Sequence, residues 1–378
     1  MEIEIVALIL AGGKGTRLEA LTRKSAKPAI EFGGKYKIID FALSNCANSE
    51  INHIGVLTQY ESSDLNSYIG DGSNWGFNGV NSLTSILSPK QTEEGSAFYK
   101  GTADAVYRNL DWLDKLNPAN VLILSGDHIY IETYLTMLKS HKDKNADCTI
   151  SVINVSKEEA SRFGILKVDS EQRILEFKEK PKNPTSTLAS MGIYIFKYKT
   201  LRNELILDAK NPESSHDFGK DIIPAMLAKK KKLYSYEYKG YWKDVGTISS
   251  LHQANMDLLL GGDSSIYSII GKNHIFTEDN HLMPQLLGEK SSVTNCLINQ
   301  GALIFGSVDS CVISSGVIVE EGAKATKCVI MSGAKLCKGC RVNNAVIAPG
   351  ITIGERVTIN KVGKEVVLVS SSVKEEGK

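Results

Sequence analysis

The last quarter of this 378-residue chain repeats itself, and the repeat restricts the folds that are open to it. Four isoleucines follow one another at separations of 15, 17 and 17 residues: Ile298, Ile313, Ile330 and Ile347. Four glycines keep the same separations: Gly301, Gly316, Gly333 and Gly350. Short apolar runs and turns that recur at a fixed period are typical of a parallel β-helix, in which each coil stacks on the last. We therefore predict a β-helix domain over residues 285–378.

The cysteines of the repeat predict buried, structural thiols. Cys296, Cys311 and Cys328 occupy one column of the repeat, and Ala345 occupies the same column one coil later. A column that accepts either Cys or Ala is a small position inside the fold. Cys337 and Cys340 form a CxxC pair, but a zinc site needs a second Cys or His pair at a suitable spacing, and the sequence has none nearby.

Residues 1–245 follow a different pattern, in which short β-rich runs alternate with amphipathic stretches. We predict strands at 6–10, 53–58, 120–125, 148–153 and 189–196, and helices at 103–116 and 130–144. Such alternation is typical of a largely parallel α/β sheet with helices on both faces, and ligands of these sheets bind at the carboxyl ends of the strands. We therefore expect a first domain over 1–245 that carries the functional site, joined to the repeat by a helical linker over 246–284.

The bulk composition excludes several classes of partner. The chain has 44 basic and 43 acidic residues, so we expect no nucleic acid, whose binding proteins usually carry a clustered basic excess. No stretch approaches the roughly 20 apolar residues that span a bilayer, so we expect no membrane partner. Seven scattered cysteines without a secretory signal predict reduced thiols and a cytoplasmic protein.

Residues 8–18, LILAGGKGTRL, place glycines and cations directly after the first predicted strand. A glycine-rich turn exposes backbone N–H groups and lets a phosphate approach closely, and the Arg17 guanidinium suits phosphate oxygens. The spacing matches neither a Walker A loop nor a dinucleotide-binding fingerprint. The residues alone favour a polyphosphate-binding turn, with a tight structural turn as the alternative. Lys27 is either a second cation of this site or an ordinary solvated lysine.

The same stretch, LAGGKGTRL followed by AKPA, resembles the signature of the sugar-nucleotide pyrophosphorylases. The continuation FGGKYKIIDFALSN (32–45) is similar to one branch of them, the glucose-1-phosphate adenylyltransferase family. Further matches follow in the family's order: TQY (58–60), FYKGTADAV (98–106), SGDHIY (125–130), FKEKP (177–181), ASMGIYIF (189–196), SSHDFGKDIIP (214–224) and GYWKDVGT (240–247). The resemblance implies a Rossmann-like nucleotidyltransferase domain with a mixed, mostly parallel sheet, followed by a left-handed parallel β-helix.

The reaction that the resemblance implies joins ATP and α-D-glucose 1-phosphate to give ADP-glucose, a glucosyl donor for glycogen or other α-glucans, and pyrophosphate. A phosphate oxygen of the sugar attacks the α-phosphorus of ATP in line. Because the second pKa of a phosphate monoester is near ~6, this nucleophile is mostly dianionic at neutral pH and needs no general base. Positioning, cations and Mg²⁺ should carry the catalysis.

The resemblance also implies a role for individual residues. The residues expected to act in catalysis are Arg17, Lys27, Asp127 and Lys180. The Mg²⁺ ligands are expected to be Asp127 and Asp244. The nucleotide is expected to contact Gly12, Gly13, Gly15, Thr16, Arg17, Gln59, Gly101 and Thr102. Glucose 1-phosphate is expected to contact Tyr99, Gly164, Glu179, Lys180 and Ser190. Without the resemblance, the two aspartates would be interpreted as turn residues, and Glu179–Lys180 as an exposed charged turn.

Regulation and assembly are implied less specifically. Lys35 resembles a lysine that relatives use for anionic effectors, and an ordinary surface lysine is the alternative. The family implies a homotetramer, or a hetero-oligomer with a regulatory sister subunit. Two positions depart from the family pattern: Ser25 stands where some relatives have a basic residue, and Phe98 stands where a tryptophan is usual.

Three other functions are compatible with parts of the sequence. A non-catalytic regulatory subunit would be expected to lose the glycine turn or the metal carboxylates, and this chain keeps both. An acyltransferase β-helix would need a catalytic histidine, and none follows His281. A preference for thymine or uracil nucleotides conflicts with the matches at 32–45 and 214–224.

Overall fold

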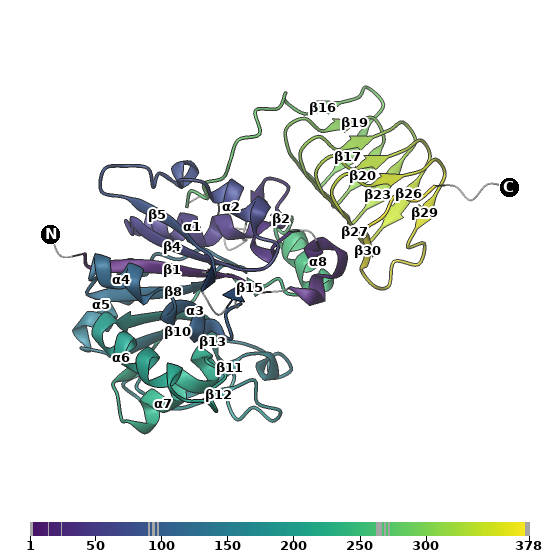
Figure 1. Ribbon diagram of the computed structural model, residues 1–378. Helices are drawn as coiled ribbons and strands as arrows, with labels where there is room; N and C mark the ends of the chain where they lie inside the picture. The colour runs from purple at the N-terminus through teal and green to yellow at the C-terminus, as the bar shows by residue number, and fades with distance from the viewer. Residues whose placement is uncertain are drawn as a thin grey trace.

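The structure is a computed structural model that describes residues 3–13, 15–23, 25–89, 91–92, 95–96, 98–261, 267, 270 and 273–374. Figure 1 shows a first domain built around a twisted sheet and, beside it, a stack of coils that ends at the C-terminus. Helix α8 (Ile248–Asp257) lies where the two meet. No helix in the described part of the chain is both long and apolar enough to cross a membrane.

The N-terminal half of the sheet is parallel. Strand β1 (Ile5–Ala11) lies between β4 (His53–Thr58) and β8 (Asn120–Ser125), and β4 also pairs with β5 (Leu83–Leu87). The sequence of β1, IVALILA, is apolar throughout because helices cover both faces of the sheet. Alternate β1 side chains therefore enter two different cores, one on each face.

The other half of the sheet is mainly antiparallel. Strand β13 (Leu188–Lys197) runs antiparallel to β8, β10 (Cys148–Asn154) and β11 (Gly164–Val168), while β11 pairs with β12 (Ile174–Glu179) in the same sense. Strand β14 (Leu233–Glu237) runs parallel to β10 and completes nine strands among the described residues. The predicted class, a mixed α/β sheet followed by a left-handed parallel β-helix, is confirmed.

Seven α-helices of the described chain accompany this sheet: α1 (Ile38–Asn48), α2 (Ser63–Ile69), α3 (Thr102–Tyr107), α4 (Leu110–Leu116), α5 (Tyr134–Asp143), α6 (Tyr198–Ala209) and α7 (Ile223–Ala228). The single helix predicted over 103–116 is wrong, because α3 and α4 are separate. Asn109 lies at the break, and its side-chain amide donates to the carbonyl of Ala105 at 2.8 Å and to the hydroxyl of Tyr99 at 3.1 Å. Such a side-chain bond competes with the helical backbone pattern.

A small two-stranded ribbon has the largest consequence for the site. The sequence predicts a helix over 130–144, but α5 begins only at Tyr134, and the preceding residues form strand β9 (His128–Tyr130). Strand β15 (Trp242–Asp244) pairs with β9 in antiparallel register, and Asp244 lies opposite His128. Two segments more than a hundred residues apart are thereby joined next to the carboxyl end of β8.

The C-terminal coils form three parallel sheets of five strands each among the described residues. The first sheet contains β16 (Leu286–Leu287), β19 (Leu303–Ile304), β22 (Ile318–Val319), β25 (Lys335–Leu336) and β28 (Thr352–Ile353). The second contains β17 (Ser292–Thr294), β20 (Ser307–Asp309), β23 (Lys324–Thr326), β26 (Arg341–Asn343) and β29 (Thr358–Ile359). The third contains β18 (Leu297–Ile298), β21 (Val312–Ile313), β24 (Val329–Ile330), β27 (Ala345–Ile347) and β30 (Val367–Val369).

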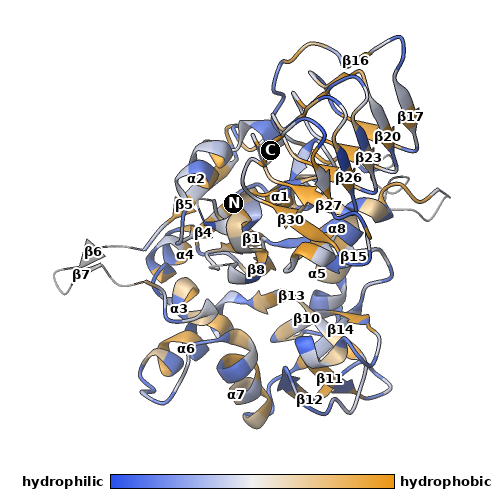
Figure 2. Ribbon diagram, turned by 90° about the vertical axis from the view of Figure 1, so that its right-hand side faces the viewer, coloured by the Kyte–Doolittle hydropathy of each residue, from blue (hydrophilic) through white to orange (hydrophobic). Residues whose placement is uncertain are grey.

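The periodic residues of the sequence stack in this third sheet. The four isoleucines pair directly, Ile298 with Ile313, Ile313 with Ile330, and Ile330 with Ile347. The four periodic glycines have φ between 66° and 74°, a left-handed conformation that glycine adopts without a steric cost. Cys311, Cys328 and Ala345 are buried, whereas Cys296 in the first coil is half-buried. All seven cysteines are free thiols. Hydrophobic segments, orange in Figure 2, recur from coil to coil, and their buried side chains form the core of the β-helix.

The two domains share an apolar core. It joins Phe32, Phe41 and Leu251 of the first part of the chain to Val329 and Val346 of the β-helix. Polar contacts surround it: the His252 Nε2 lies 2.8 Å from the carbonyl oxygen of Lys327, and the Ser332 N–H donates to the Glu31 carboxylate at 2.9 Å. The boundaries at 245 and 285 stay predictions. Helix α8 lies inside the proposed linker, of which residues 262–266, 268–269 and 271–272 fall outside the described residues.

Candidate active site

The glycine-rich turn follows β1 at the carboxyl edge of the sheet. Gly15 has φ 59°, and a Cβ there would lie 2.9 Å from the Thr22 Cγ2 atom, so both conformation and space favour glycine. A 3-10 helix, η1 (Thr16–Thr22), follows directly. Its last residue, Thr22, contacts the turn again, because the Thr22 hydroxyl donates to the Gly15 carbonyl at 3.0 Å. A Cβ at Gly13 would meet nothing within 4 Å, so the backbone there faces open space.

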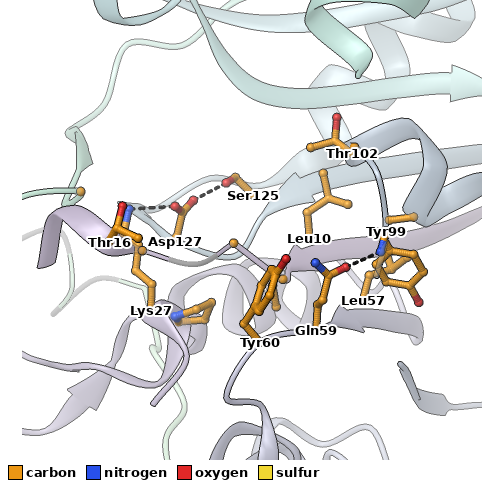
Figure 3. Close-up of a pocket in the computed structure, with 18 of the residues that line it drawn as sticks. Leu10, Thr16, Lys27, Leu57, Gln59, Tyr60, Tyr99, Thr102, Ser125 and Asp127 are labelled. Atoms are coloured by element: carbon orange, nitrogen blue, oxygen red, sulfur yellow. Dashed lines mark hydrogen bonds and ion pairs between the residues drawn. The ribbon is translucent and has the colours of Figure 1, made fainter. Parts of the chain in front are cut away.

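A cavity of about 630 Å³ lies beside this turn (Figure 3). It is lined by all eight residues predicted to contact the nucleotide: Gly12, Gly13, Gly15, Thr16, Arg17, Gln59, Gly101 and Thr102. Lys27, Tyr99 and Asp127 line it as well. The Gln59 side-chain oxygen accepts a hydrogen bond from the Tyr99 N–H at 2.7 Å. This bond joins the carboxyl end of β4 to the segment before α3.

Gly101, which lines this cavity, and the two departures from the family pattern each have defined structural surroundings. A Cβ at Gly101 would lie 2.3 Å from the carbonyl oxygen of His216, so the approach of two backbones already requires glycine there. Phe98, the departure from the family pattern, is exposed and stacks on Tyr60 with ring centroids 4.6 Å apart. Ser25, the other departure, is half-buried in the bend between η1 and the 3-10 helix η2 (Lys27–Ala29).

The β9–β15 ribbon brings Asp127 and Asp244 together. Ligand atoms of Asp127, His128 and Asp244 all lie within 4.8 Å of one another. The ammonium of Lys27 bridges the two carboxylates, 2.7 Å from Asp127 Oδ2 and 3.1 Å from Asp244 Oδ1. Ser125 donates a further hydrogen bond to Asp127. The two acids and the cradle of glycines therefore share one site.

The charges of this cluster depend on one another. Burial opposes the charge of Lys27, but Asp127 and Asp244 outweigh burial and raise the pKa of the ammonium above its usual value. Burial also disfavours the ionised form of both acids, yet Lys27 and His128 hold the pKa of each carboxyl below its usual value. All three groups are therefore charged at neutral pH.

This cluster fits a divalent cation. Its two carboxylates offer the hard oxygen donors that Mg²⁺ prefers, and Mg²⁺ commonly uses only one or two carboxylates besides phosphates and waters. A positive group, the Lys27 ammonium, already lies between them. The arrangement can hold a metal beside a bound polyphosphate.

A second cavity, of about 270 Å³, adjoins the first at Asp127. It is lined by four of the five residues predicted to contact the sugar phosphate: Gly164, Glu179, Lys180 and Ser190. The fifth, Tyr99, lines only the first cavity, where its hydroxyl bonds to Leu87 and Asn109.

Glu179 and Lys180 are positioned by close backbone contacts. A Cβ at Gly164 or Gly219 would lie 2.9 Å or 2.6 Å from the Glu179 Oε2 atom, so two glycines make room for this carboxylate. The Lys180 backbone has φ 46°, and its N–H donates to the Phe163 carbonyl at 3.1 Å. The Lys180 side chain is 64% exposed, and its ammonium lies 3.3 Å from the Glu179 Oε1 atom. The lysine is therefore free to turn toward a ligand.

Several residues around the cavities were missed in the sequence. Ser125 and His128 flank Asp127 in the motif SGDHIY, so the motif itself could have indicated them. Asp217 lines both cavities, accepts the Thr102 hydroxyl at 2.9 Å and caps the π-helix η5 (Phe218–Ile222). Arg162 lies near Asp244 and has no sequence signal.

Lys35 lies away from both cavities. It lines a third cavity, of about 370 Å³, with Gly34 of the first domain, Thr277 and Glu278 of the connecting segment, and Ser315 of the β-helix. The structure thus separates the residue predicted for effectors from the residues predicted for substrates.

The fold and the paired carboxylates at its carboxyl edge define a nucleotidyl transferase. The family model "Nucleotidyl transferase" matches residues 6–261, and "GlmU-like, C-terminal hexapeptide" matches residues 281–366. The chain is 48% identical over 371 residues to the glucose-1-phosphate adenylyltransferases of Bacillus mycoides (strain KBAB4) and Bacillus cereus (strain ATCC 10987 / NRS 248). Each alignment covers 97% of this chain and 94% of the relative. The chain therefore belongs to the glucose-1-phosphate adenylyltransferase family, and the predicted resemblance is confirmed.

Proposed function

We propose that this protein transfers the adenylyl group of ATP to α-D-glucose 1-phosphate, giving ADP-glucose for glycogen or α-glucan synthesis and releasing pyrophosphate. The observation that carries this proposal is the meeting of Asp127 and Asp244 where the two cavities join. One cavity offers a glycine turn for a polyphosphate, and the other offers Glu179 and Lys180 for a sugar phosphate.

In this proposal the first cavity holds ATP. Exposed N–H groups of the turn at Gly12 and Gly13 face the phosphates, and Arg17 adds a planar cation. Gly246 leaves room for that side chain, since a Cβ there would lie 3.2 Å from the Arg17 Nη2 atom. Lys27 lies at the junction and can shift from the carboxylates to a phosphate oxygen.

Asp127 and Asp244 would hold Mg²⁺. When bound, Mg²⁺ supplies positive charge that neutralises phosphate oxygens and favours departure of pyrophosphate. Ser125 keeps Asp127 oriented through its hydrogen bond, and the β9–β15 pairing keeps Asp244 at its side.

The second cavity would orient the nucleophile. Lys180 neutralises the phosphate of glucose 1-phosphate, and Glu179 accepts hydrogen bonds from glucose hydroxyls. Because the sugar phosphate is already mostly dianionic at neutral pH, no side chain has to remove a proton. Catalysis then rests on holding two anions in line, which can supply several kcal/mol of the barrier, roughly 7–11 in well-oriented model reactions.

Two features favour an active enzyme over a regulatory sister subunit. The charged groups of the site, Arg17, Lys27, Asp127, Lys180 and Asp244, are all present, and they converge on two adjoining cavities. The β-helix acts as a scaffold in this proposal. Apolar side chains fill the interior of its coils, and it shares an apolar core with the first domain.

We further propose a cytoplasmic homotetramer, or a hetero-oligomer with a sister subunit, that responds to anionic effectors at Lys35. Seven free thiols support a reducing compartment. The cavity at Lys35 touches both domains, so a ligand there could bias their packing.

The function is tested with purified protein, Mg²⁺ and glucose 1-phosphate. Each nucleoside triphosphate is supplied in turn while pyrophosphate is measured, with and without fructose 1,6-bisphosphate. We expect release of pyrophosphate with ATP well above that with the other nucleotides. Equal rates with UTP or dTTP would contradict the adenylyl assignment, and no pyrophosphate with any nucleotide would contradict the enzyme assignment.

A further inference from the structure

Arg162 is held beside the carboxylate cluster by aromatic packing. It ends the 3-10 helix η4 (Ala160–Arg162), and the next residue, Phe163, packs against Trp242 with ring centroids 5.1 Å apart and planes at 65°. Trp242 begins strand β15, which ends at Asp244. This packing brings the Arg162 Nη2 atom within 3.6 Å of the Asp244 Oδ2 atom.

One nitrogen of this guanidinium, Nη2, is buried and lacks a hydrogen-bond acceptor. A separation of 3.6 Å is too long for a hydrogen bond, and the buried Nη2 atom finds no other acceptor among the described residues. A buried donor left in this state costs about 1–3 kcal/mol. Arg162 also lines the second cavity, together with Lys180. An acceptor oxygen in that cavity would remove the cost.

The charges that line the second cavity favour a role for Arg162. Four carboxylates line it, those of Asp127, Glu179, Asp217 and Asp244, and they would repel a dianionic phosphate. Three arginine and lysine side chains line it as well, Arg17, Arg162 and Lys180, and Arg17 is already assigned to the nucleotide in the proposed function. Lys180 and Arg162 each lie beside one of these carboxylates, Lys180 at 3.3 Å from Glu179 and Arg162 at 3.6 Å from Asp244. The Arg162 side chain is 37% exposed, against 64% for Lys180, and its planar guanidinium presents two parallel N–H groups that match two phosphate oxygens.

We propose that Arg162 binds the phosphate of the sugar 1-phosphate and, with Lys180, sets its position beside Asp244. This inference rests on the proposed function and assigns a further residue to the same site. In the structure the guanidinium lies beside Asp244 at 3.6 Å. A cation held by Asp127 and Asp244 would weaken this contact and would leave the guanidinium available to the substrate phosphate.

The test compares Arg162→Ala and Arg162→Lys with the wild type, and uses Arg202→Ala as the matched control. Arg202 forms an exposed ion pair with Asp114 and lines neither cavity. Steady-state KM values are measured for glucose 1-phosphate and ATP, and in reverse for ADP-glucose and pyrophosphate. Binding of glucose 1-phosphate is measured by calorimetry, without turnover, and circular dichroism checks that each variant is folded.

We expect Arg162→Ala to raise the KM for glucose 1-phosphate and for ADP-glucose about tenfold to a hundredfold, and to weaken glucose 1-phosphate binding by a similar factor. The values for ATP and pyrophosphate should change less than about threefold, and Arg162→Lys should fall between, because lysine keeps the charge but not the fork.

Unchanged glucose 1-phosphate binding in both folded variants would overturn the inference, and so would equal shifts for both substrates or a change confined to the Mg²⁺ requirement. Those last results would mean that Arg162 only orients Asp244. If the wild-type enzyme releases pyrophosphate normally while the Arg162 variants give any of these contradicting results, only the Arg162 inference fails and the proposed function stands. A wild type that neither binds glucose 1-phosphate nor releases pyrophosphate refutes both.

Discussion

The β-helix and the catalytic site differ in how far apart along the chain their contacting residues lie. In the β-helix each residue of the isoleucine column pairs with its counterpart one coil away, for example Ile313 with Ile330. In the site, Lys27 contacts Asp127 and Asp244, which are 100 and 217 residues away. The first kind of contact repeats along the sequence, and the second kind occurs once.

This difference separates the two tasks of the molecule. The β-helix derives its shape from many similar contacts between neighbouring coils, so its loss of stability on mutation should be local and unrelated to chemistry. The site depends on a few charged groups that the fold brings together from distant segments, so single changes there should affect catalysis strongly. The following substitutions test this division, beginning with the largest expected effect.

Asp127→Asn should lower kcat by at least about a hundredfold, because the amide removes a negative charge from the cation site. Pyrophosphate release at saturating substrates and Mg²⁺ measures this. The matched control is Asp309→Asn, on an exposed position of β20 in the β-helix, which should leave kcat unchanged. Turnover of Asp127→Asn close to that of the wild type would remove the metal role of this residue.

Lys180→Gln should raise the KM for glucose 1-phosphate about tenfold to a hundredfold and that for ATP much less, because the lost charge-assisted bonds concern only the sugar phosphate. Lys178→Gln is the control, since Lys178 pairs with Glu176 and lines neither cavity. Equal increases for both substrates would count against the assignment of the second cavity.

Ile330→Ala should reduce the free energy of unfolding of the β-helix by about 2–5 kcal/mol, because Ile330 is fully buried in the coil interior. The KM values and kcat of the folded enzyme should stay within about twofold of the wild type. Urea unfolding followed by circular dichroism, beside the exposed control Thr358→Ala, measures the loss. If activity fell in proportion while the protein remained folded, the β-helix would be part of the catalytic machinery.

Asp40 of α1 lies close to the segment that connects the first domain to the β-helix, so a substitution there probes the junction between the two domains. It is buried, accepts the Tyr68 hydroxyl at 2.8 Å, and Tyr68 in turn bonds to Thr277 on the segment that leads to the β-helix. Burial raises the pKa of Asp40 to about 6. Because this is above the value in the unfolded chain, the contribution of Asp40 to stability is complete below about pH 4 and is lost as the pH rises through about 6.

Asp40→Asn cannot ionise, so its unfolding temperature should rise relative to the wild type between pH 4 and pH 7, by the equivalent of at most about 3 kcal/mol. Thermal unfolding across this pH range measures the difference, with the exposed Asp143→Asn as control. A constant difference between Asp40→Asn and wild type at every pH would show that the burial of Asp40 does not affect its ionisation.

This difference in sequence separation also explains which features could be predicted from the sequence and which could not. The isoleucine column and the turn glycines were visible as a period, and the strands of the sheet as apolar runs. The β9–β15 ribbon was not predicted, because nothing in either short segment indicates that it pairs with the other. The helix predicted from residue 130 also overlapped the end of β9. Asp127 and Asp244 were therefore named from the family resemblance alone.

Other parts of the site also depend on contacts that could not be predicted from the sequence. Gly101 is explained by the His216 carbonyl that presses against it, a contact over more than a hundred residues. The location of Tyr99 in the first cavity depends on the bend before α3 and on its bond to Asn109. Arg162 depends on the packing of Phe163 against Trp242. None of these contacts leaves a mark at a fixed spacing in the sequence.

The most direct test is to measure the affinity of the protein for Mn²⁺, as a paramagnetic substitute for Mg²⁺, by electron paramagnetic resonance in the wild type, Asp127→Asn, Asp244→Asn and the double variant. If both acids bind one cation, each single variant should lose at least about tenfold in affinity, and the double variant little more, because the two residues act as a unit. Wild-type affinity in either single variant would show that these two acids, although adjacent, do not share a metal.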